Sequence, residues 1–192
     1  MHIVHYPHPT LRHKSKPIKR VDAELKKTVR QMFTLMYEAK GVGLAANQVD
    51  LPLRMFVVNV EADPEKGDEL VFLNPVLSKP KGLDEAEEGC LSLPELYGDV
   101  KRPEKIKVNA FTLKGEEIEA ELDGIFARVV QHENDHLDGV MFIDRMSETG
   151  RSQILPEIDV FERDFEFRRE KGEIPDDEAI AKRLAGLEKQ YC

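Results

Sequence analysis

The chain has 192 residues, of which 34% are charged, and its 28 Lys and Arg against 37 Asp and Glu give a net charge of −9. This balance excludes the broad cationic surface that sequence-independent nucleic-acid binding requires. No apolar run is long enough to span a bilayer, and the first residues lack the apolar core of a secretory signal, so we expect a cytoplasmic protein without a membrane contact.

The first predicted element is an amphipathic helix over residues 22–38. Asp22 is a suitable residue to begin this helix, and Gly41 is a suitable residue to end it. Two short apolar runs follow at 54–60 and 70–73, separated by the polar stretch 63–68, which is typical of strands joined by a loop. The apolar spacing of three and four residues that predicts the helix is carried by Leu25, Val29, Met32, Phe33 and Met36.

Two further strands and a second helix are predicted in the middle of the chain. Residues 106–110 and 118–122 alternate apolar and polar side chains, as half-buried antiparallel strands do, and they meet near Gly115. Residues 125–138 carry one broad apolar stripe, and Gly139 follows it as a helix stop.

These elements predict an α+β fold in which antiparallel strands wrap around a central helix, with additional helices at the N- and C-terminal ends. We expect residues 1–148 to form the main domain. We expect residues 149–192 to be a helical extension packed on that domain, with one helix around 158–165 and another beginning near Asp176. The extension has too few apolar residues to predict a core of its own.

The central helix contains His132-Glu133-Asn134-Asp135-His136. Two histidines four residues apart lie on the same face of a helix, so their imidazoles can bind one metal ion. Glu133, next to the first histidine, can then reach a metal-bound water without being a ligand. The alternative is a solvated helix that happens to carry two histidines, but the apolar stripe beside them disfavours it because an unpartnered buried imidazole is costly.

The spacing alone leaves the third ligand open. A His-x-x-Gly-x-x-His continuation is excluded because the final position is Phe142. A downstream Glu at 148, 157 or 162 would make a zinc endopeptidase. Cys90 is the competing candidate, although a single free cysteine is more often a small buried apolar residue.

Three ordered motifs resemble those of peptide deformylases. They are Gly41-Val42-Gly43-Leu44-Ala45-Ala46-Asn47-Gln48, Glu88-Gly89-Cys90-Leu91-Ser92, and Gln131-His132-Glu133-x-x-His136-Leu137-Asp138-Gly139. The resemblance extends over residues 3–145, and three motifs in order are far more specific than one short match.

The resemblance implies an amidase that removes the formyl group from the N-terminal formyl-methionine of new polypeptides and releases formate. It assigns Cys90, His132 and His136 as ligands of one divalent metal ion, with a metal-bound water as the nucleophile. Ferrous iron is the expected ion, and zinc, nickel or cobalt are its substitutes.

The resemblance also implies the roles of residues around the metal. Glu133 is the general acid and base, while the Gln48 amide and the Leu91 backbone N–H stabilise the oxyanion. The predicted substrate-binding residues are Val42, Gly43, Glu88 and Gly89. We further expect Glu88 and Arg102 to form an ion pair that braces the Cys90 loop.

Partners follow from the same resemblance. The expected partner is a nascent peptide with N-formyl-Met, with transient contact to the ribosome. Relatives dock at the ribosome with a basic C-terminal helix, whereas residues 145–192 here have nine Lys and Arg against twelve Asp and Glu, so that mode of docking is disfavoured. A metal-stabilised binding protein without catalysis is the remaining alternative. The histidines at 2, 5, 8 and 13 are expected at the surface.

Overall fold

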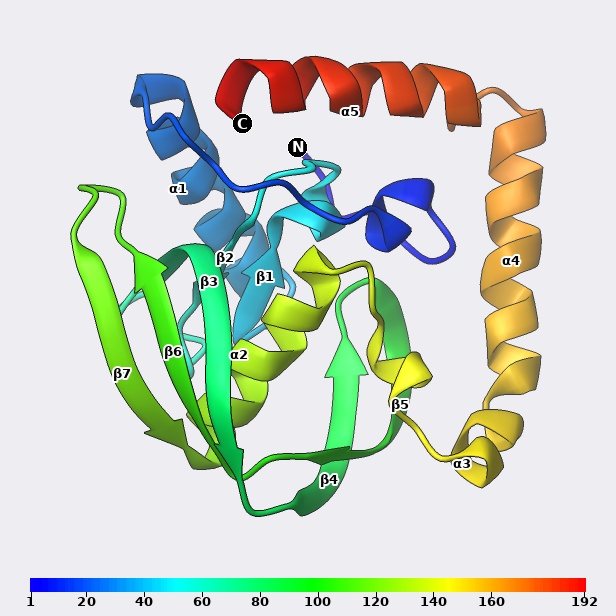
Figure 1. Cartoon of the computed structure of the whole chain (residues 1–192). Helices are drawn as coiled ribbons and strands as arrows, with labels where there is room; N and C mark the ends of the chain where they lie inside the picture. Colours follow the sequence, from blue (N-terminus) through cyan, green and yellow to red (C-terminus); the bar gives the residue numbers. More distant parts are fainter.

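The computed structural model describes residues 1–192 (Figure 1). It confirms the predicted α+β class, with antiparallel sheets and helices from both ends of the chain. The elements in chain order are η1 (Pro9–Arg12), α1 (Ala23–Glu38), β1 (Gly43–Ala45), η2 (Ala46–Val49), β2 (Met55–Val58), β3 (Leu70–Lys81), β4 (Asp84–Cys90), β5 (Leu93–Arg102), β6 (Lys105–Phe111), β7 (Glu117–Asp123), α2 (Gly124–Leu137), η3 (Phe142–Asp144), α3 (Glu148–Gln153), α4 (Leu155–Glu170) and α5 (Asp177–Tyr191).

Two antiparallel sheets form the β-structure. Five strands pair in the order β1-β2-β3-β6-β7, while β4 and β5 pair only with each other. The predicted pairing of β6 with β7 is confirmed, and Gly115 adopts a positive φ of 81° in their connecting turn. The β4–β5 hairpin was not predicted, because its many charged residues hide the alternation of a half-buried strand.

Strand β3 is longer than predicted, since it continues from Leu70 to Lys81 and does not end at residue 73. Its pairing with β6 is interrupted twice, and Asn74 and Lys79 have positive φ angles of 53° and 50°. Pro75 and Pro80 follow these two residues directly. Proline within a run argues against a regular strand, which is why the sequence pattern missed the second half.

Helix α2 lies between the five-stranded sheet and the β4–β5 hairpin (Figure 1). Its apolar side packs against the five-stranded sheet, where Ala127, Val130 and Leu137 are buried with residues of β2, β3, β6 and β7. Its other side is polar and faces the hairpin. From this side, Arg128 donates a hydrogen bond to the carbonyl of Val100 in β5 (3.0 Å). The helix that carries two of the three predicted metal ligands is therefore enclosed from two directions.

Helix α1 covers the other face of the β1–β2 region. The apolar residues that predicted this helix are buried in one cluster with residues of β1 and β2. Asp22 caps the helix by accepting a hydrogen bond from the backbone N–H of Leu25 (2.9 Å). The helix ends at Glu38, and Gly41 takes part in this end as predicted, because its backbone N–H donates to the carbonyl of Met36 (2.8 Å). The left-handed residue of the turn is Lys40, at φ 56°. A Cβ at Gly41 would lie 2.7 Å from Cδ1 of Leu91, so a larger residue there would displace the end of that side chain.

The C-terminal segment forms three helices that contact the rest of the chain. Ile158 of α4 packs in a cluster with residues of β5 and η3, and Tyr191 of α5 packs with α1. Asp176 caps α5 by accepting from the backbone N–H of Ala179 (2.8 Å). None of the helices in the structure has the length and apolar content needed to cross a bilayer.

One prediction about the N-terminal histidines was wrong. His8 is only 6% exposed, and its ring packs edge-on against Phe165 of α4, with a centroid distance of 6.2 Å. The helical tail covers this histidine, and an N-terminal sequence pattern contains no information about a contact made more than 150 residues later.

Candidate active site

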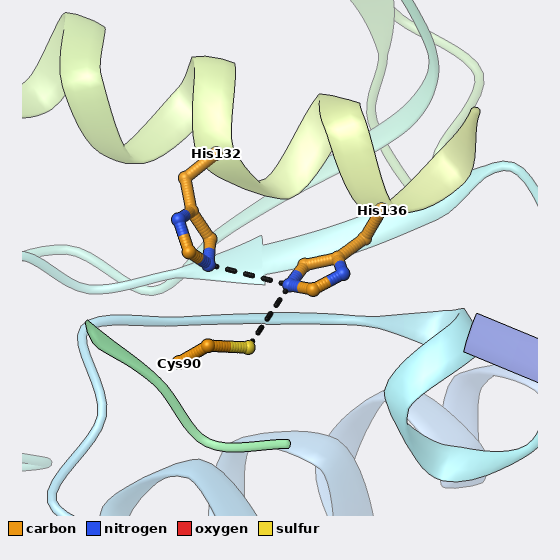
Figure 2. A group of neighbouring side chains, drawn as sticks. All are labelled: Cys90, His132 and His136. Carbon is orange, nitrogen blue, oxygen red and sulfur yellow. Dashed lines mark hydrogen bonds between the residues drawn. The ribbon is translucent and has the colours of Figure 1, made fainter. Parts of the chain in front are cut away.

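Three predicted metal ligands meet beside α2 (Figure 2). His132 and His136 lie one turn apart on that helix, with their Nε2 atoms 3.2 Å apart. Cys90 ends β4, where the pairing with β5 becomes irregular, and its Sγ lies 3.3 Å from Nε2 of His136. These three side chains form a metal-binding site whose ligand atoms all lie within 4.8 Å of one another.

The donor set fits a tetrahedral divalent ion. Metal–nitrogen bonds of about 2.0–2.1 Å and metal–sulfur bonds of about 2.3 Å place tetrahedral ligand atoms about 3.3–3.6 Å apart. The distances from Nε2 of His136 to its two neighbours agree with that spacing. Three protein ligands leave one position of a tetrahedron open, as catalytic sites do and structural sites do not.

The two imidazoles are in different electrostatic environments. Burial lowers the pKa of His136 well below its ordinary value, so this ring is neutral, as a ligand must be. Burial also acts to lower the pKa of His132, but hydrogen bonds to Cys90 and Glu88 outweigh it and raise the pKa to about 10, so binding of a metal ion at this ring must release a proton. The second nitrogen of His132, Nδ1, lies 3.0 Å from Oε2 of Glu88, which fixes the ring orientation.

Glu88 is the centre of a buried ion network. Arg102 donates to both of its carboxylate oxygens, at 2.7 and 2.9 Å, which confirms the predicted ion pair. Arg128 donates to Oε1 at 2.7 Å. Arg102 also reaches Oδ2 of Asp135 at 2.7 Å, so the network ties β4 and β5 to α2 on both sides of the metal site.

Replacing Glu88 by Gln should lower the free energy of unfolding by about 3–5 kcal/mol, since it removes the buried anion that Arg102 and Arg128 share and leaves each with a single carboxylate, Asp135 and Asp84. Denaturant unfolding of metal-free protein would measure this loss. As the matched control we expect Glu87→Gln, at an exposed neighbouring position, to change stability by less than about 0.5 kcal/mol. Equal stability of the two variants would contradict a structural role for the network.

The same carboxylate makes stability depend on pH. Burial alone would raise the pKa of Glu88, but hydrogen bonds from His132 and Arg102 hold it far below its usual value. A carboxyl group whose pKa is lower in the folded state than in the unfolded state stabilises the fold when it is ionised. This stabilisation is complete above the pKa of the unfolded state, about 4.3, and is lost as the pH falls below that value. Glu88→Gln should therefore show a weaker loss of stability on acidification than the native chain.

Gln48 is held rigidly beside the metal ligands. It lies in η2 and is 1% exposed, and its Oε1 accepts a hydrogen bond from the backbone N–H of Ala45 (2.9 Å). This contact orients the amide so that Nε2 lies 3.4 Å from Sγ of Cys90 and 3.3 Å from Oγ of Ser92. A fixed N–H donor thus faces the metal-binding site.

Glu133 is buried next to the ligands, with 4% exposure, and its Oε2 has no hydrogen-bond partner. Burial raises its pKa to about 7. Gly43 lies directly against it, because a Cβ on Gly43 would lie 2.5 Å from Oε1 of Glu133. The steric reason for glycine at position 43 is therefore room for this carboxyl group.

The remaining predicted residues are direct neighbours in the chain of Cys90 or Gly43. Leu91 directly follows Cys90, and its side chain lies against Gly41. Gly89 pairs with Tyr97 across the hairpin, and a Cβ on Gly89 would lie 2.7 Å from that ring. The carbonyl of Val42 accepts a hydrogen bond from the backbone N–H of Asn59 (3.0 Å).

The structure resolves the choice of third ligand left open by the sequence. Cys90 joins the two histidines, whereas Glu162 is hydrogen-bonded by the Tyr6 hydroxyl (3.2 Å) and Glu148 is exposed at the start of α3. Sequence reasoning missed Arg128, which could have been noticed as a cation on the same helix face as His132. It also missed Asp135, whose carboxylate pairs with Arg145 as well as with Arg102.

Comparisons with known proteins agree with this geometry. The sequence model described as polypeptide deformylase matches residues 1–152. A peptide deformylase of Rhodopirellula baltica is 52% identical over 189 residues, which are 98% of this chain and 94% of that protein. A crystal structure of Arabidopsis thaliana peptide deformylase 1B with an inhibitor has a TM-score of 0.85 at 40% identity, covering 92% of this chain and 97% of that one. A Thermotoga maritima peptide deformylase has a TM-score of 0.71 at 42% identity, covering 76% of this chain and 96% of that one.

Proposed function

This chain belongs to the peptide deformylase family, hydrolases that remove the N-formyl group from nascent peptides, and we propose which of its residues perform that reaction. Cys90, His132 and His136 bind one catalytic divalent metal ion. The observation that carries this proposal is the convergence of one cysteine sulfur and two imidazole nitrogens beside a buried, unpartnered carboxylate oxygen of Glu133. Ferrous iron is the proposed ion, and zinc, nickel or cobalt are expected to substitute for it.

A divalent metal ion held by these ligands would lower the pKa of a water molecule bound to it. Glu133 accepts a proton from the attacking water and then delivers it to the amide nitrogen. This delivery is needed because an unprotonated nitrogen would have to leave as an anion, and the C–N bond then breaks slowly. Its pKa near 7 suits both directions of proton transfer at neutral pH.

Two donors stabilise the oxyanion that develops on the formyl oxygen. Gln48 contributes its Nε2 and Leu91 contributes its backbone N–H. The hydrogen bond from Ala45 to Gln48 supports this role, since a donor that is already oriented costs no reorganisation when the charge develops.

Val42, Gly43, Glu88 and Gly89 are the proposed substrate-binding residues. Since the Glu88 carboxylate already pairs with Arg102, Arg128 and His132, we assign any substrate contact of this residue to its backbone. Val42 directly precedes β1 and Gly43 begins it, and β1 is an edge strand of the five-stranded sheet, so its free edge can pair with an extended peptide.

We also propose a division of the chain into a catalytic domain, residues 1–148, and a helical extension, residues 149–192, packed on it. The end of the family match at residue 152 and the contacts of α4 and α5 with the N-terminal part support this division. The proposed location is the cytoplasm, where nascent peptides become available. We also propose transient contact with the ribosome. This contact does not use a basic C-terminal helix.

One experiment tests the assignment as a whole. Purified protein should release formate from a formyl-Met peptide, contain about one divalent ion per chain, and cleave no internal peptide bond. Internal fragments would favour the endopeptidase alternative, and full metal content without formate release would favour a metal-stabilised binding protein.

Replacing Gln48 by Ala should reduce kcat for a formyl-Met peptide by about 10²–10³-fold, as loss of one oxyanion donor does elsewhere. Metal content should stay at the native level, because Gln48 contacts Cys90 only through a 3.4 Å amide contact. Formate release and metal analysis on the same preparation would check both statements. A kcat within threefold of the native value would contradict the role of Gln48.

A further inference from the structure

The turn that carries Gln48 is held by residues from outside the turn. Asn47, which precedes Gln48, donates its side-chain N–H to the carbonyls of Thr10 (3.2 Å) and His13 (2.7 Å). Its Oδ1 accepts from the hydroxyl of Ser15 (2.7 Å). The N-terminal segment therefore fixes one side of the turn.

The other side of the turn is held by α5. Asp50 ends η2 in the left-handed conformation at φ 65°, which is unfavourable for a residue with a Cβ and persists only where neighbours support it. Nη1 of Arg183 donates to the Asp50 carbonyl (2.8 Å), and Nη2 of the same guanidinium contacts Oδ1 of Asp50. One side chain of α5 thus binds both the backbone and the side chain of the residue that ends the turn.

A second contact from α5 supports the N-terminal segment. The buried carboxylate of Glu188 lies 2.8 Å from Nε2 of His13 and 2.6 Å from Nζ of Lys16. His13 is the residue whose carbonyl holds Asn47. Figure 1 shows this arrangement: α5 runs across the N-terminal segment, and the η2 turn lies below that segment.

We propose that α5 positions the oxyanion donor of the active site, and that Arg183 is a positioning residue acting through Asp50 on Gln48. This inference rests on the proposed function of Gln48. It concerns a helix outside residues 1–152, the part of the chain that the family model matches. Arg183 itself contacts no metal ligand.

The physical requirement is the accuracy with which the donor must be held. A hydrogen-bond donor that stabilises a transition state must stay within about 0.5 Å of its productive position. Gln48 Nε2 lies between Cys90 and Ser92, and a small rotation of η2 would move it away from both. The Thr10 hydroxyl also donates to Oδ1 of Asp50, so Arg183 is one of two side chains that hold this left-handed residue. Loss of the Arg183 contact leaves the Asp50 carbonyl without its side-chain donor and loosens η2 enough to allow that rotation.

A double-mutant cycle tests the inference on the full-length metal-loaded enzyme. Arg183→Ala should lower kcat for a formyl-Met peptide about three- to tenfold, with KM and metal content unchanged. In a Gln48→Ala background the same Arg183→Ala change should cause no further loss, because the group it positions is gone. Arg183→Lys, which keeps the charge but has a single donor group, should have an intermediate kcat.

Lys182→Ala is the matched control, since Lys182 is the exposed neighbour on the same helix and should leave kcat unchanged. An equal loss from Arg183→Ala in both backgrounds would show a general effect on the fold and overturn the inference. A native kcat in Arg183→Ala would overturn it as well. A native kcat in Gln48→Ala alone would instead overturn the proposed role of Gln48, so the two failures are distinguishable.

Discussion

Replacing Glu133 by Gln is expected to lower the turnover of a formyl-Met peptide by about 10²–10⁴-fold, the usual contribution of general acid–base catalysis. The amide is nearly the same size as the carboxyl group, so the space beside Gly43 stays filled. Cys90, His132 and His136 are unchanged, and the metal should remain bound. Formate release and metal content, measured on one preparation, would check this result.

The control for Glu133 is Glu148→Gln, which changes an exposed glutamate that is one of the three candidate ligands of the endopeptidase alternative. This variant should keep native activity and native metal content. Near-native formate release by metal-loaded Glu133→Gln would show that Glu133 is not the proton carrier. Loss of metal in Glu148→Gln would reopen the choice of third ligand.

Replacing Cys90 by Ala is expected to remove bound metal and deformylase activity together. Changing a residue that only supports a ligand already costs about 10–100-fold in metal affinity, and loss of a ligand should cost more. With Sγ absent, two imidazoles on one helix are left to hold the ion. Metal analysis after dialysis, together with formate release, would measure both losses.

Cys192→Ala is the matched control for Cys90, because it removes the only other thiol of the chain. Its Sγ contacts the carbonyl of Lys16 and lies outside the group of metal ligands, so metal and activity should be retained. Full metal occupancy in Cys90→Ala, or equal metal loss in the two variants, would refute Cys90 as a ligand.

Much of the fold was predictable because it depends on short-range patterns. The apolar spacing of α1, the alternation of β6 and β7, and the capping residue Asp176 of α5 each act within a few residues. Strand β4 and the second half of β3 were missed. Charged residues and internal prolines obscure their periodicity, and only pairing with a distant strand makes them strands.

In the metal centre, too, some ligands follow from local sequence spacing and another depends on the tertiary fold. The four-residue spacing of His132 and His136 predicts two ligands, since helix geometry alone places them on one face. Spacing could not choose Cys90 over Glu148, Glu157 or Glu162, and resemblance to a family was needed to prefer it. The fold makes that choice physically, because the β4–β5 hairpin brings residue 90 to within 3.3 Å of residue 136.

The sequence by itself therefore determined the α+β class and the helix with its two histidines and the carboxyl group of Glu133 beside them, since each follows from local periodicity or helix geometry. Only the tertiary structure decided how these groups are supported. The Glu88–Arg102 pair was anticipated, but the position of Arg128 on the same carboxylate was not. The contact between Arg183 and Asp50 spans 133 residues. Such contacts depend on the packing of whole elements, and no local pattern encodes which distant side chain will lie opposite.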